Sequence, residues 1–147
     1  MEFAEGNSLA ELCKKYRAMG ENTGLFFFKQ LLDSLEYLQE NKVAHLDLKP
    51  HNMLLTRDLT LKLTDFGISQ NQNTDSLSKY CGTHGYMAPE IAEIRKSQFY
   101  KPYNGHEADV FSAGVCLFNF VCGVSPFKQA SSTDDYNYFL ISSGNKE

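Results

Sequence analysis

Hydrophobic side chains recur at helical spacing in the first forty residues of the chain. Ser8 and Glu11 form a Ser-x-x-Glu capping box, which predicts a helix that begins at about Leu9. Thr23 could cap a second helix, in which leucine and phenylalanine side chains repeat every three or four residues up to about Asn41. The pattern therefore predicts two consecutive helices in this part of the chain.

The hydrophobic spacing then changes to that of short strands. Residues 43–45 and 53–55 are short, mostly apolar stretches, and Leu59, Leu61 and Leu63 alternate with polar residues; each of the three segments predicts a strand. Residues 69–80 are polar and rich in turn-forming side chains. They predict a long loop, and long loops in compact domains are commonly functional.

Residues 110–127 contain no charged side chain and approach the length of a membrane span. Interspersed small and polar residues lower the hydropathy of this segment, and Pro126 breaks its end. We expect a helix over Asp109 to Cys122 that is buried on all sides within the protein, with a membrane span as the alternative. A last helix is expected over residues 134–142, so the chain is predicted to be mostly helical with a few short strands.

Composition narrows the class of protein. With 147 residues, 42% hydrophobic and 22% charged, the chain suits one soluble globular domain. A net charge of -4 without a basic run argues against nucleic acid as the main partner. The start lacks the pattern of a secretory signal, which favours a cytoplasmic location. The cysteines lack zinc-ligand spacing and are expected to be free thiols: Cys13, Cys81, Cys116 and Cys122.

The strongest chemical motif is His-Leu-Asp-Leu-Lys-Pro-His-Asn at residues 45–52. It matches the catalytic loop of protein kinases at every fixed position but one. In such a loop Asp47 would accept the proton of a substrate hydroxyl, and Asn52 would offer a neutral oxygen to magnesium. Lys49 could stabilise negative charge on the transferred phosphoryl group. The alternative for a loop Asp and Asn is simple turn formation, but the match of the whole octet favours the kinase interpretation.

Two further motifs follow in the kinase order. Asp-Phe-Gly at residues 65–67 comes after an apolar run, and residues 82–90 close in Ala-Pro-Glu. The chain thus resembles the protein kinase superfamily along its whole length, as a partial kinase domain over residues 1–147, from the hinge to about helix G. Residues 65–90 would be the activation segment. The resemblance implies the C-terminal lobe of the protein kinase-like fold, with the N-terminal lobe absent and the last helices missing.

The resemblance also implies roles for other residues. Asp65 would bind magnesium that bridges to the phosphates of ATP. The backbone of Glu2 and Ala4 would bond adenine at a hinge, and Leu54 would line the nucleotide site. Asp109 would anchor the backbone of the catalytic loop. His45 and Phe66 would belong to a packed spine on the buried central helix.

The type of kinase is indicated by a few positions. Lys49, two residues after Asp47, together with Thr83 resembles the serine/threonine branch rather than the tyrosine branch. Residues 80–89 and 121–127 look closest to the calcium/calmodulin-dependent kinase group. The implied partners are ATP, Mg2+ and protein substrates with serine or threonine acceptors, without nucleic acid or membrane; the oligomeric state stays open.

The chain departs from the kinase pattern in several places. No Gly-rich loop or strand lysine precedes Met1, and the sequence stops before the family's last helices. The parent protein is therefore expected to be an ATP-dependent serine/threonine kinase, and the isolated fragment to be inactive. The alternatives are a catalytically inactive binding or regulatory fragment and a truncated gene model. Ser8 and His51 stand where kinases that prefer basic substrates carry glutamate.

Leu46 replaces the arginine that usually precedes the catalytic aspartate. That arginine ordinarily pairs with a phosphate on the activation loop. Lys79 and Lys101 could take its place, but lysine lacks the two-pronged geometry of arginine. The substitution predicts weak dependence on loop phosphorylation, for which the loop offers these candidate acceptors: Thr74, Ser76, Ser78 and Tyr80.

Overall fold

The computed structural model describes residue 4 and residues 6–72, 77–94 and 101–143. Within these residues the chain is mostly helical with a few short strands, as the hydrophobic pattern predicted. The elements in chain order are α1 (Leu9–Tyr16), α2 (Glu21–Glu40), β1 (Val43–Ala44), the 3-10 helix η1 (Pro50–Asn52), β2 (Met53–Leu55), β3 (Leu61–Leu63), β4 (Gln70–Asn71), α3 (Pro89–Ile94), α4 (Gly105–Cys122) and α5 (Tyr136–Ser142).

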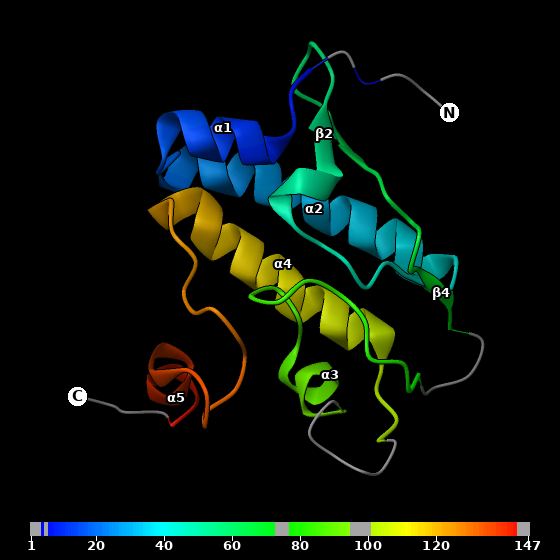
Figure 1. The fold of residues 1–147 in the computed structure, drawn as a ribbon. Helices are drawn as coiled ribbons and strands as arrows, with labels where there is room; N and C mark the ends of the chain where they lie inside the picture. Colours follow the sequence, from blue (N-terminus) through cyan, green and yellow to red (C-terminus); the bar gives the residue numbers. More distant parts are fainter. Residues whose placement is uncertain (1–3, 5, 73–76, 95–100, 144–147) are drawn as a thin grey trace.

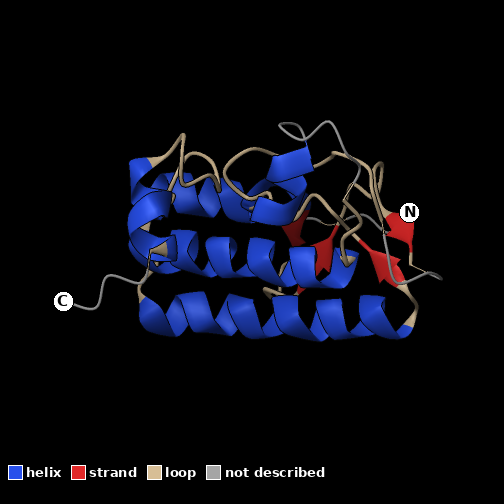
Figure 2. Cartoon of the chain, turned by 90° about the horizontal axis from the view of Figure 1, so that it is seen from below, coloured by secondary structure: helices blue, strands red, loops and turns tan. Residues whose placement is uncertain are grey.

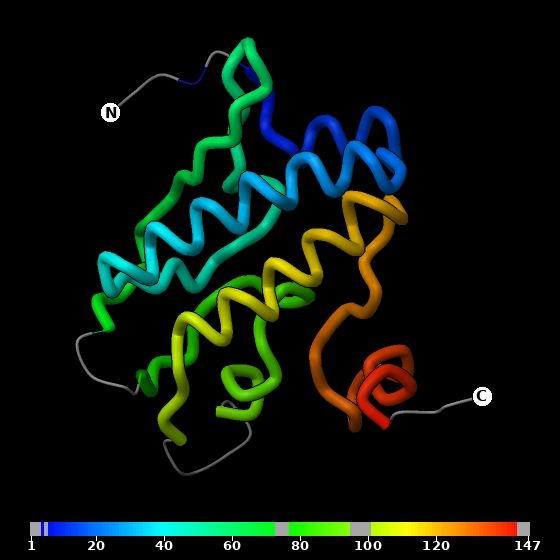
Figure 3. The backbone as a smooth tube through the Cα atoms, turned by 180° about the vertical axis from the view of Figure 1, so that it is seen from behind, coloured from blue at the N-terminus to red at the C-terminus, as the bar shows by residue number. Residues whose placement is uncertain are grey.

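The two long helices α2 and α4 lie side by side and run in opposite directions (Figures 1 and 3). Close contact is possible where α2 begins, because Gly24 has no side chain there and faces Val121 of α4. Just before α2, the backbone N–H of Met19 donates to the carbonyl of Phe120 at 2.9 Å. This pair of helices forms the centre of the molecule.

The short helix α1 covers one end of this pair. Its capping box is present as predicted, since the Ser8 hydroxyl accepts from the Glu11 N–H and the Glu11 carboxylate accepts from the Ser8 N–H. Leu9 is completely buried and packs with Phe120 and Met53 in the main hydrophobic core. Viewed from below, the helices form layers and the strands gather at one end (Figure 2).

The strands form two small antiparallel pairs. In the first, β2 pairs with β3, with Met53 opposite Leu63 and Leu55 opposite Leu61. In the second, β1 pairs with β4. Strand β4 lies inside residues 69–80, where the sequence predicted only loop, so that prediction was wrong at this point. Strand β4 is defined by its hydrogen bonds to β1, and β1 comes from a distant part of the sequence.

Several predicted boundaries were also wrong. Helix α2 begins at Glu21 rather than after Thr23, and Gly20 occupies its cap position without a side-chain hydrogen bond. Helix α4 begins at Gly105, four residues before Asp109, because the Asn104 side chain caps it by accepting from two backbone N–H groups. The remaining differences are a shorter α5, an unpredicted α3, and a third strand that begins at Leu61 because Leu59 lies in the turn with a φ of 63°.

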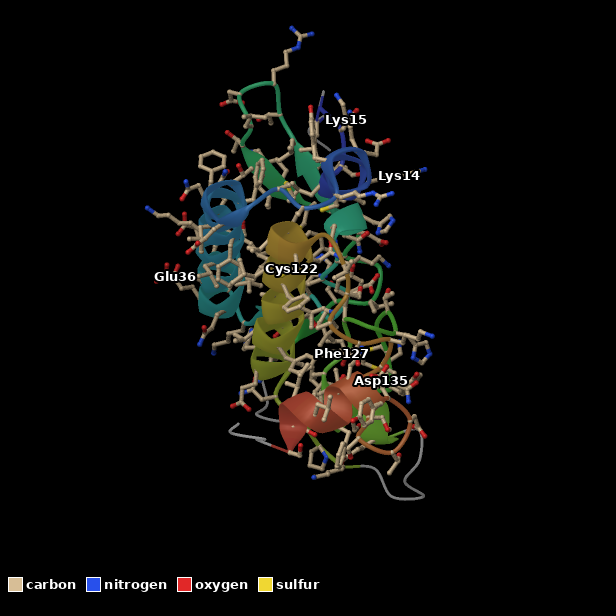
Figure 4. The ribbon with its side chains drawn as sticks, turned by 90° about the vertical axis from the view of Figure 1, so that its left-hand side faces the viewer. Lys14, Lys15, Glu36, Cys122, Phe127 and Asp135 are labelled. Carbon is tan, nitrogen blue, oxygen red and sulfur yellow. The ribbon has the colours of Figure 1, made fainter. Side chains whose placement is uncertain are left out.

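Beyond α4, the chain is held by aromatic packing. Phe127 contacts Phe111 of α4 at a ring-centroid distance of 6.0 Å and Tyr138 of α5 at 5.2 Å. Asp135 caps α5 by accepting from the Tyr138 N–H. Figure 4 shows Phe127 and Asp135 in this part of the molecule, with Lys14 and Lys15 of α1 toward the opposite end of the view. Among the described helices, none is long and apolar enough to cross a membrane. The prediction that α4 is buried on all sides was wrong, because Val110 is 61% and Phe118 42% exposed, while Ala113, Cys116 and Phe120 are buried.

The close approach of α2 and α4 can be tested with two helical glycines. A Cβ at Gly24 would lie 2.8 Å from the Val121 side chain, whereas a Cβ at Gly114 would meet nothing within 4 Å. We expect Gly114→Ala to raise the free energy of unfolding by about 0.5–1 kcal/mol, because alanine favours helix. We expect Gly24→Ala to lower it by about 1 kcal/mol, because the stiff valine cannot easily move. Urea unfolding followed by circular dichroism measures both, and equal stabilisation by the two substitutions would contradict the interface described.

Candidate active site

The loop between β1 and η1 is fixed to helix α4 by one carboxylate. Asp109 Oδ2 accepts from the backbone N–H of His45 at 2.6 Å, and Oδ1 accepts from the N–H of Leu46 at 2.8 Å. Asp109 is buried, and burial raises its pKa to about 6 although the two N–H donors act in the lowering direction. The predicted anchoring of the catalytic loop backbone by Asp109 is present in the structure.

These bonds hold a backbone conformation that is unfavourable by itself. Leu46 has a φ of 67°, in the left-handed region that side chains other than glycine rarely adopt. Asp65 has a φ of 63°. Such residues cost on the order of 1–3 kcal/mol each and cluster at functional sites. The two hydrogen bonds to Asp109 hold the backbone at Leu46 in this conformation.

The His45 ring organises the loop from inside. It is completely buried, its Nδ1 accepts from the Asp47 N–H at 3.2 Å, and its Nε2 donates to the Thr64 carbonyl at 3.0 Å. This pairing requires the neutral ring with hydrogen on Nε2. Burial lowers the pKa of His45, because a charged ring would be poorly solvated there. Phe66 packs against this ring at a centroid distance of 4.7 Å and stays 43% exposed.

Four of the predicted site residues meet at the Asp47 carboxylate. Lys49 Nζ donates to Asp47 Oδ2 at 2.7 Å and to Thr83 Oγ1 at 2.8 Å. Thr83 Oγ1 in turn donates to Asp47 Oδ1 at 2.6 Å. Asn52 Nδ2 donates to the Asp47 carbonyl at 2.9 Å and to Oδ2 at 3.2 Å. The structure thus joins the catalytic loop to residue 83, which lies thirty-six positions away in the sequence.

These neighbours control the ionisation of Asp47. Partial burial acts to raise its pKa, but the bonds from Lys49, Thr83 and Asn52 outweigh burial. The pKa of Asp47 is therefore lowered below its ordinary value, and the group is ionised at neutral pH.

Asn52 and Asp65 come from the two sides of the β2–β3 hairpin at its open end. Asn52 directly precedes β2, and its carbonyl accepts from the N–H of Thr64 at 3.0 Å, one residue before Asp65. Asn52 is buried, whereas Asp65 is exposed. Both side chains offer oxygen atoms, which Mg2+ prefers. Within the described residues no cluster of three or more His, Cys, Asp or Glu could hold a metal ion.

The predicted nucleotide-binding residues are placed only in part. Leu54 is half-buried in β2, and Ser8 forms an isolated antiparallel bridge with it. Gly6 donates to the Leu55 carbonyl at 2.8 Å, so the chain before α1 runs beside β2. Ala4 lies at the start of this segment and is half-buried, while Glu2 lies outside the described residues.

Sequence reasoning missed three residues that support the site. Thr64 connects His45 to Asn52 through its backbone, Tyr103 contacts residues 77–81, and Gln72 hydrogen-bonds to the first turn of α4. The bonds at Thr64 are made by backbone atoms, and those at Tyr103 and Gln72 span more than twenty residues. None has a local spacing that could have indicated it.

The four cysteines are free in the structure, in agreement with the sequence prediction. Cys81 and Cys116 are buried, Cys13 is half-buried and Cys122 is exposed. Burial raises the pKa of the Cys116 thiol, and it also raises the pKa of the less buried Cys13 thiol. Buried protonated thiols are poor nucleophiles, so Cys116 is not a candidate nucleophile.

Comparison with known proteins agrees with this geometry. Residues 1–143 match the family model described as the protein kinase domain. The cAMP-dependent protein kinase catalytic subunit of Schizosaccharomyces pombe is 38% identical over 140 residues, which is 95% of this chain and 26% of that protein. CBL-interacting protein kinase 11 of Oryza sativa subsp. japonica is 36% identical over 92% of this chain and 27% of its own length. The carbon catabolite-derepressing protein kinase of Secale cereale is 37% identical over 86% of this chain and 24% of its own length. The chain therefore spans about a quarter of the length of these relatives.

The Thr83 hydroxyl can be tested as a determinant of Asp47 ionisation. Thr83→Val removes the donor to Asp47 Oδ1 and keeps a similar shape, so we expect the pKa of Asp47 to rise. Thr83→Ser keeps the hydroxyl and should leave the pKa close to the wild-type value. Titration of the Asp47 carboxyl carbon by NMR measures the shift. An unchanged pKa in Thr83→Val would contradict the hydrogen-bond assignment.

Proposed function

Because this chain belongs to the protein kinase domain family, we propose that it forms the catalytic part of a serine/threonine protein kinase. The observation that carries the proposal is the single hydrogen-bonded cluster of Asp47, Lys49, Asn52 and Thr83. The relatives are named as protein kinases, and the parent protein would transfer the γ-phosphate of ATP to serine or threonine hydroxyls of proteins.

In the proposed reaction Asp47 is the general base. The substrate hydroxyl oxygen forms a bond to the γ-phosphorus, the bond between that phosphorus and the bridging oxygen of ADP breaks, and the hydroxyl proton passes to Asp47. Thr83 and Lys49 hold the two carboxylate oxygens, so the base keeps one orientation while the substrate enters. Positioning of this kind supplies much of the catalysis in phosphoryl transfer.

Lys49 has a second role in the proposal. Its ammonium group lies 2.7 Å from Asp47 Oδ2 and 2.8 Å from Thr83 Oγ1, beside the place where the hydroxyl would react. A cation there stabilises charge on the phosphoryl group as it transfers. Its side chain is about one-fifth exposed, so water screens this charge only partly.

Asn52 and Asp65 would hold magnesium at the open end of the β2–β3 hairpin. Asn52 makes both of its bonds to Asp47 through the amide nitrogen, which leaves the amide oxygen for a cation. Two protein oxygens are a typical set for magnesium bound together with phosphates. When bound, the ion would neutralise part of the phosphate charge. The adenine of bound ATP would lie near Leu54, Ala4 and Glu2.

We also propose a subgroup and a place of action. The similarity of residues 80–89 and 121–127 supports the calcium/calmodulin-dependent kinase group. Residues 65–90 would act as the activation segment between the metal-binding Asp65 and the half-buried Glu90. The proposed location is the cytoplasm.

Replacement of the base tests the proposal. We expect Asp47→Asn, in the full-length protein that contains this chain, to lower phosphate transfer to a serine peptide by roughly 10²–10⁴-fold, the usual contribution of a general base. ATP affinity should change little, since Asp47 faces the acceptor hydroxyl. Transfer of radiolabelled phosphate from ATP measures the first quantity and nucleotide titration the second.

The matched control is Glu36→Gln on the exposed side of α2 (Figure 4). It removes one carboxylate far from the cluster and should leave turnover unchanged. Turnover at the wild-type level in Asp47→Asn would remove Asp47 from the role of base. A wild-type protein that binds peptide but transfers no phosphate would favour the alternative, an inactive binding or regulatory fragment.

Regulation by phosphate gives a second test. Leu46 is buried among apolar side chains that include Leu77 and Ala88, so it cannot bind a phosphate. We expect replacement of the loop acceptors by alanine to lower activity less than about fivefold, because an ordering bond from arginine to phosphate is missing. The replaced residues are Thr74, Ser76 and Ser78, of which the first two lie outside the described residues.

Activity is compared before and after phosphatase treatment of the wild-type protein and the triple variant. A loss on the order of 100-fold, equivalent to about 2.7 kcal/mol, would show that another cation takes the place of arginine. Lys79 is the described candidate nearest to the acceptor Ser78 in the sequence, and it is exposed.

A further inference from the structure

Tyr103 contacts the activation segment at three points. Its backbone exchanges two hydrogen bonds with Leu77, each of 2.7 Å. Its hydroxyl donates to the carbonyl of Lys79 at 2.8 Å and lies 3.6 Å from the Cys81 sulfur. The contacts cover alternate residues of one extended stretch, so this part of the segment is held along one side.

The tyrosine is buried where it makes these contacts. Only 5% of its surface is exposed, and it packs in an apolar cluster with Leu46, Leu77 and Cys81. A hydroxyl in such a place is costly unless it is hydrogen-bonded. The bond to the Lys79 carbonyl therefore fixes the ring and the segment relative to each other.

The held stretch leads directly into the catalytic cluster. After Cys81 comes Gly82, whose φ is 105° and whose Cβ, if it had one, would lie 2.8 Å from the Leu46 carbonyl oxygen. Thr83 follows and donates to Asp47 at 2.6 Å. Only one residue, Gly82, thus separates Cys81, whose sulfur lies beside the Tyr103 hydroxyl, from Thr83, whose hydroxyl orients the base.

The chain that follows Tyr103 is also fixed by hydrogen bonds. The next residue, Asn104, caps α4 and accepts from the side-chain amide of Gln72 at 2.9 Å. The Gln72 side-chain oxygen accepts from the Gly105 N–H at 2.8 Å. Gln72 thereby holds the earlier part of the activation segment to the same turn of α4. That helix also carries Asp109, the anchor of the catalytic loop.

We propose that Tyr103 is a positioning residue for phosphoryl transfer: its hydroxyl fixes residues 79–83 so that Thr83 meets Asp47. The effect on phosphoryl transfer rests on the proposed function. The anchoring of residues 79–83 by Tyr103 rests on the contacts alone. All groups in this anchor are neutral. Hydrogen bonds and apolar packing therefore hold residues 77–81 against Tyr103.

The test uses Tyr103→Phe in the full-length protein, because this change removes the hydroxyl and keeps the ring and the backbone bridge. The control is Tyr37→Phe, since Tyr37 is 66% exposed on α2. Turnover and KM for ATP are measured together with hydrogen–deuterium exchange of the peptides covering residues 77–83 and α2. We expect turnover to fall about tenfold, the value of one hydrogen bond of about 1.4 kcal/mol. KM for ATP should stay unchanged.

Exchange should become faster in residues 77–83 and stay unchanged in α2. Wild-type turnover with unchanged exchange would overturn the proposal. Faster exchange in α2 as well would also overturn it, because the hydroxyl would then serve general stability. If the wild-type protein transfers no phosphate, the proposed function fails, and the exchange of residues 77–83 still decides whether Tyr103 anchors the segment.

Discussion

One carboxylate sets the geometry on which the proposed site depends. Asp109 accepts from the consecutive N–H groups of His45 and Leu46, and it does so from inside the protein. Leu46 is thereby held at a positive φ, which turns the chain so that Asp47 faces Lys49 and Thr83. A lone buried carboxylate would be unfavourable, and these two donors offset part of that cost.

Helix α4 extends this control to the rest of the molecule. Its first turn is capped by Asn104 and bonded to Gln72, and its Ser112 hydroxyl donates to the carbonyl of Tyr86 at 2.7 Å. Its last turn accepts from Met19 before α2. Helix α4 therefore contacts the loop at His45 and Leu46, Gln72 and Tyr86 of the proposed activation segment, and the chain just before α2. Changes in its packing should be transmitted to the Asp47 cluster.

The part of the site that the sequence could predict is the part encoded locally. Asp47, Lys49 and Asn52 lie within six residues, so their spacing alone indicates their chemistry. Thr83 and Asp65 were identified because their own short motifs follow in the kinase order. The structure brings Thr83 to the Asp47 cluster, and it places Asp65 next to Thr64 at the open end of the hairpin.

Tyr103 and Gln72 were not predictable in the same way. Each acts on residues more than twenty positions away, and a tyrosine before a helix cap or a glutamine in a polar loop has no distinctive pattern. The start of α2 was misplaced for a related reason. Thr23 has a good capping side chain, but α2 begins earlier, at Glu21. Gly24 therefore already lies inside the helix where it contacts α4. Tertiary contacts decided these features over local preference.

The most direct test of the account is the turnover of Asp109→Asn in the full-length protein. Asparagine replaces one of the two carboxylate oxygens with an NH2 group that only donates, so one of the bonds from His45 and Leu46 loses its acceptor. Measured where circular dichroism shows the variant folded, turnover at saturating ATP and peptide should fall on the order of 100-fold, as expected for one lost hydrogen bond to a charged group. Asp33→Asn on the exposed side of α2 should have no effect. Wild-type turnover in Asp109→Asn would contradict the claim that this carboxylate positions the catalytic loop.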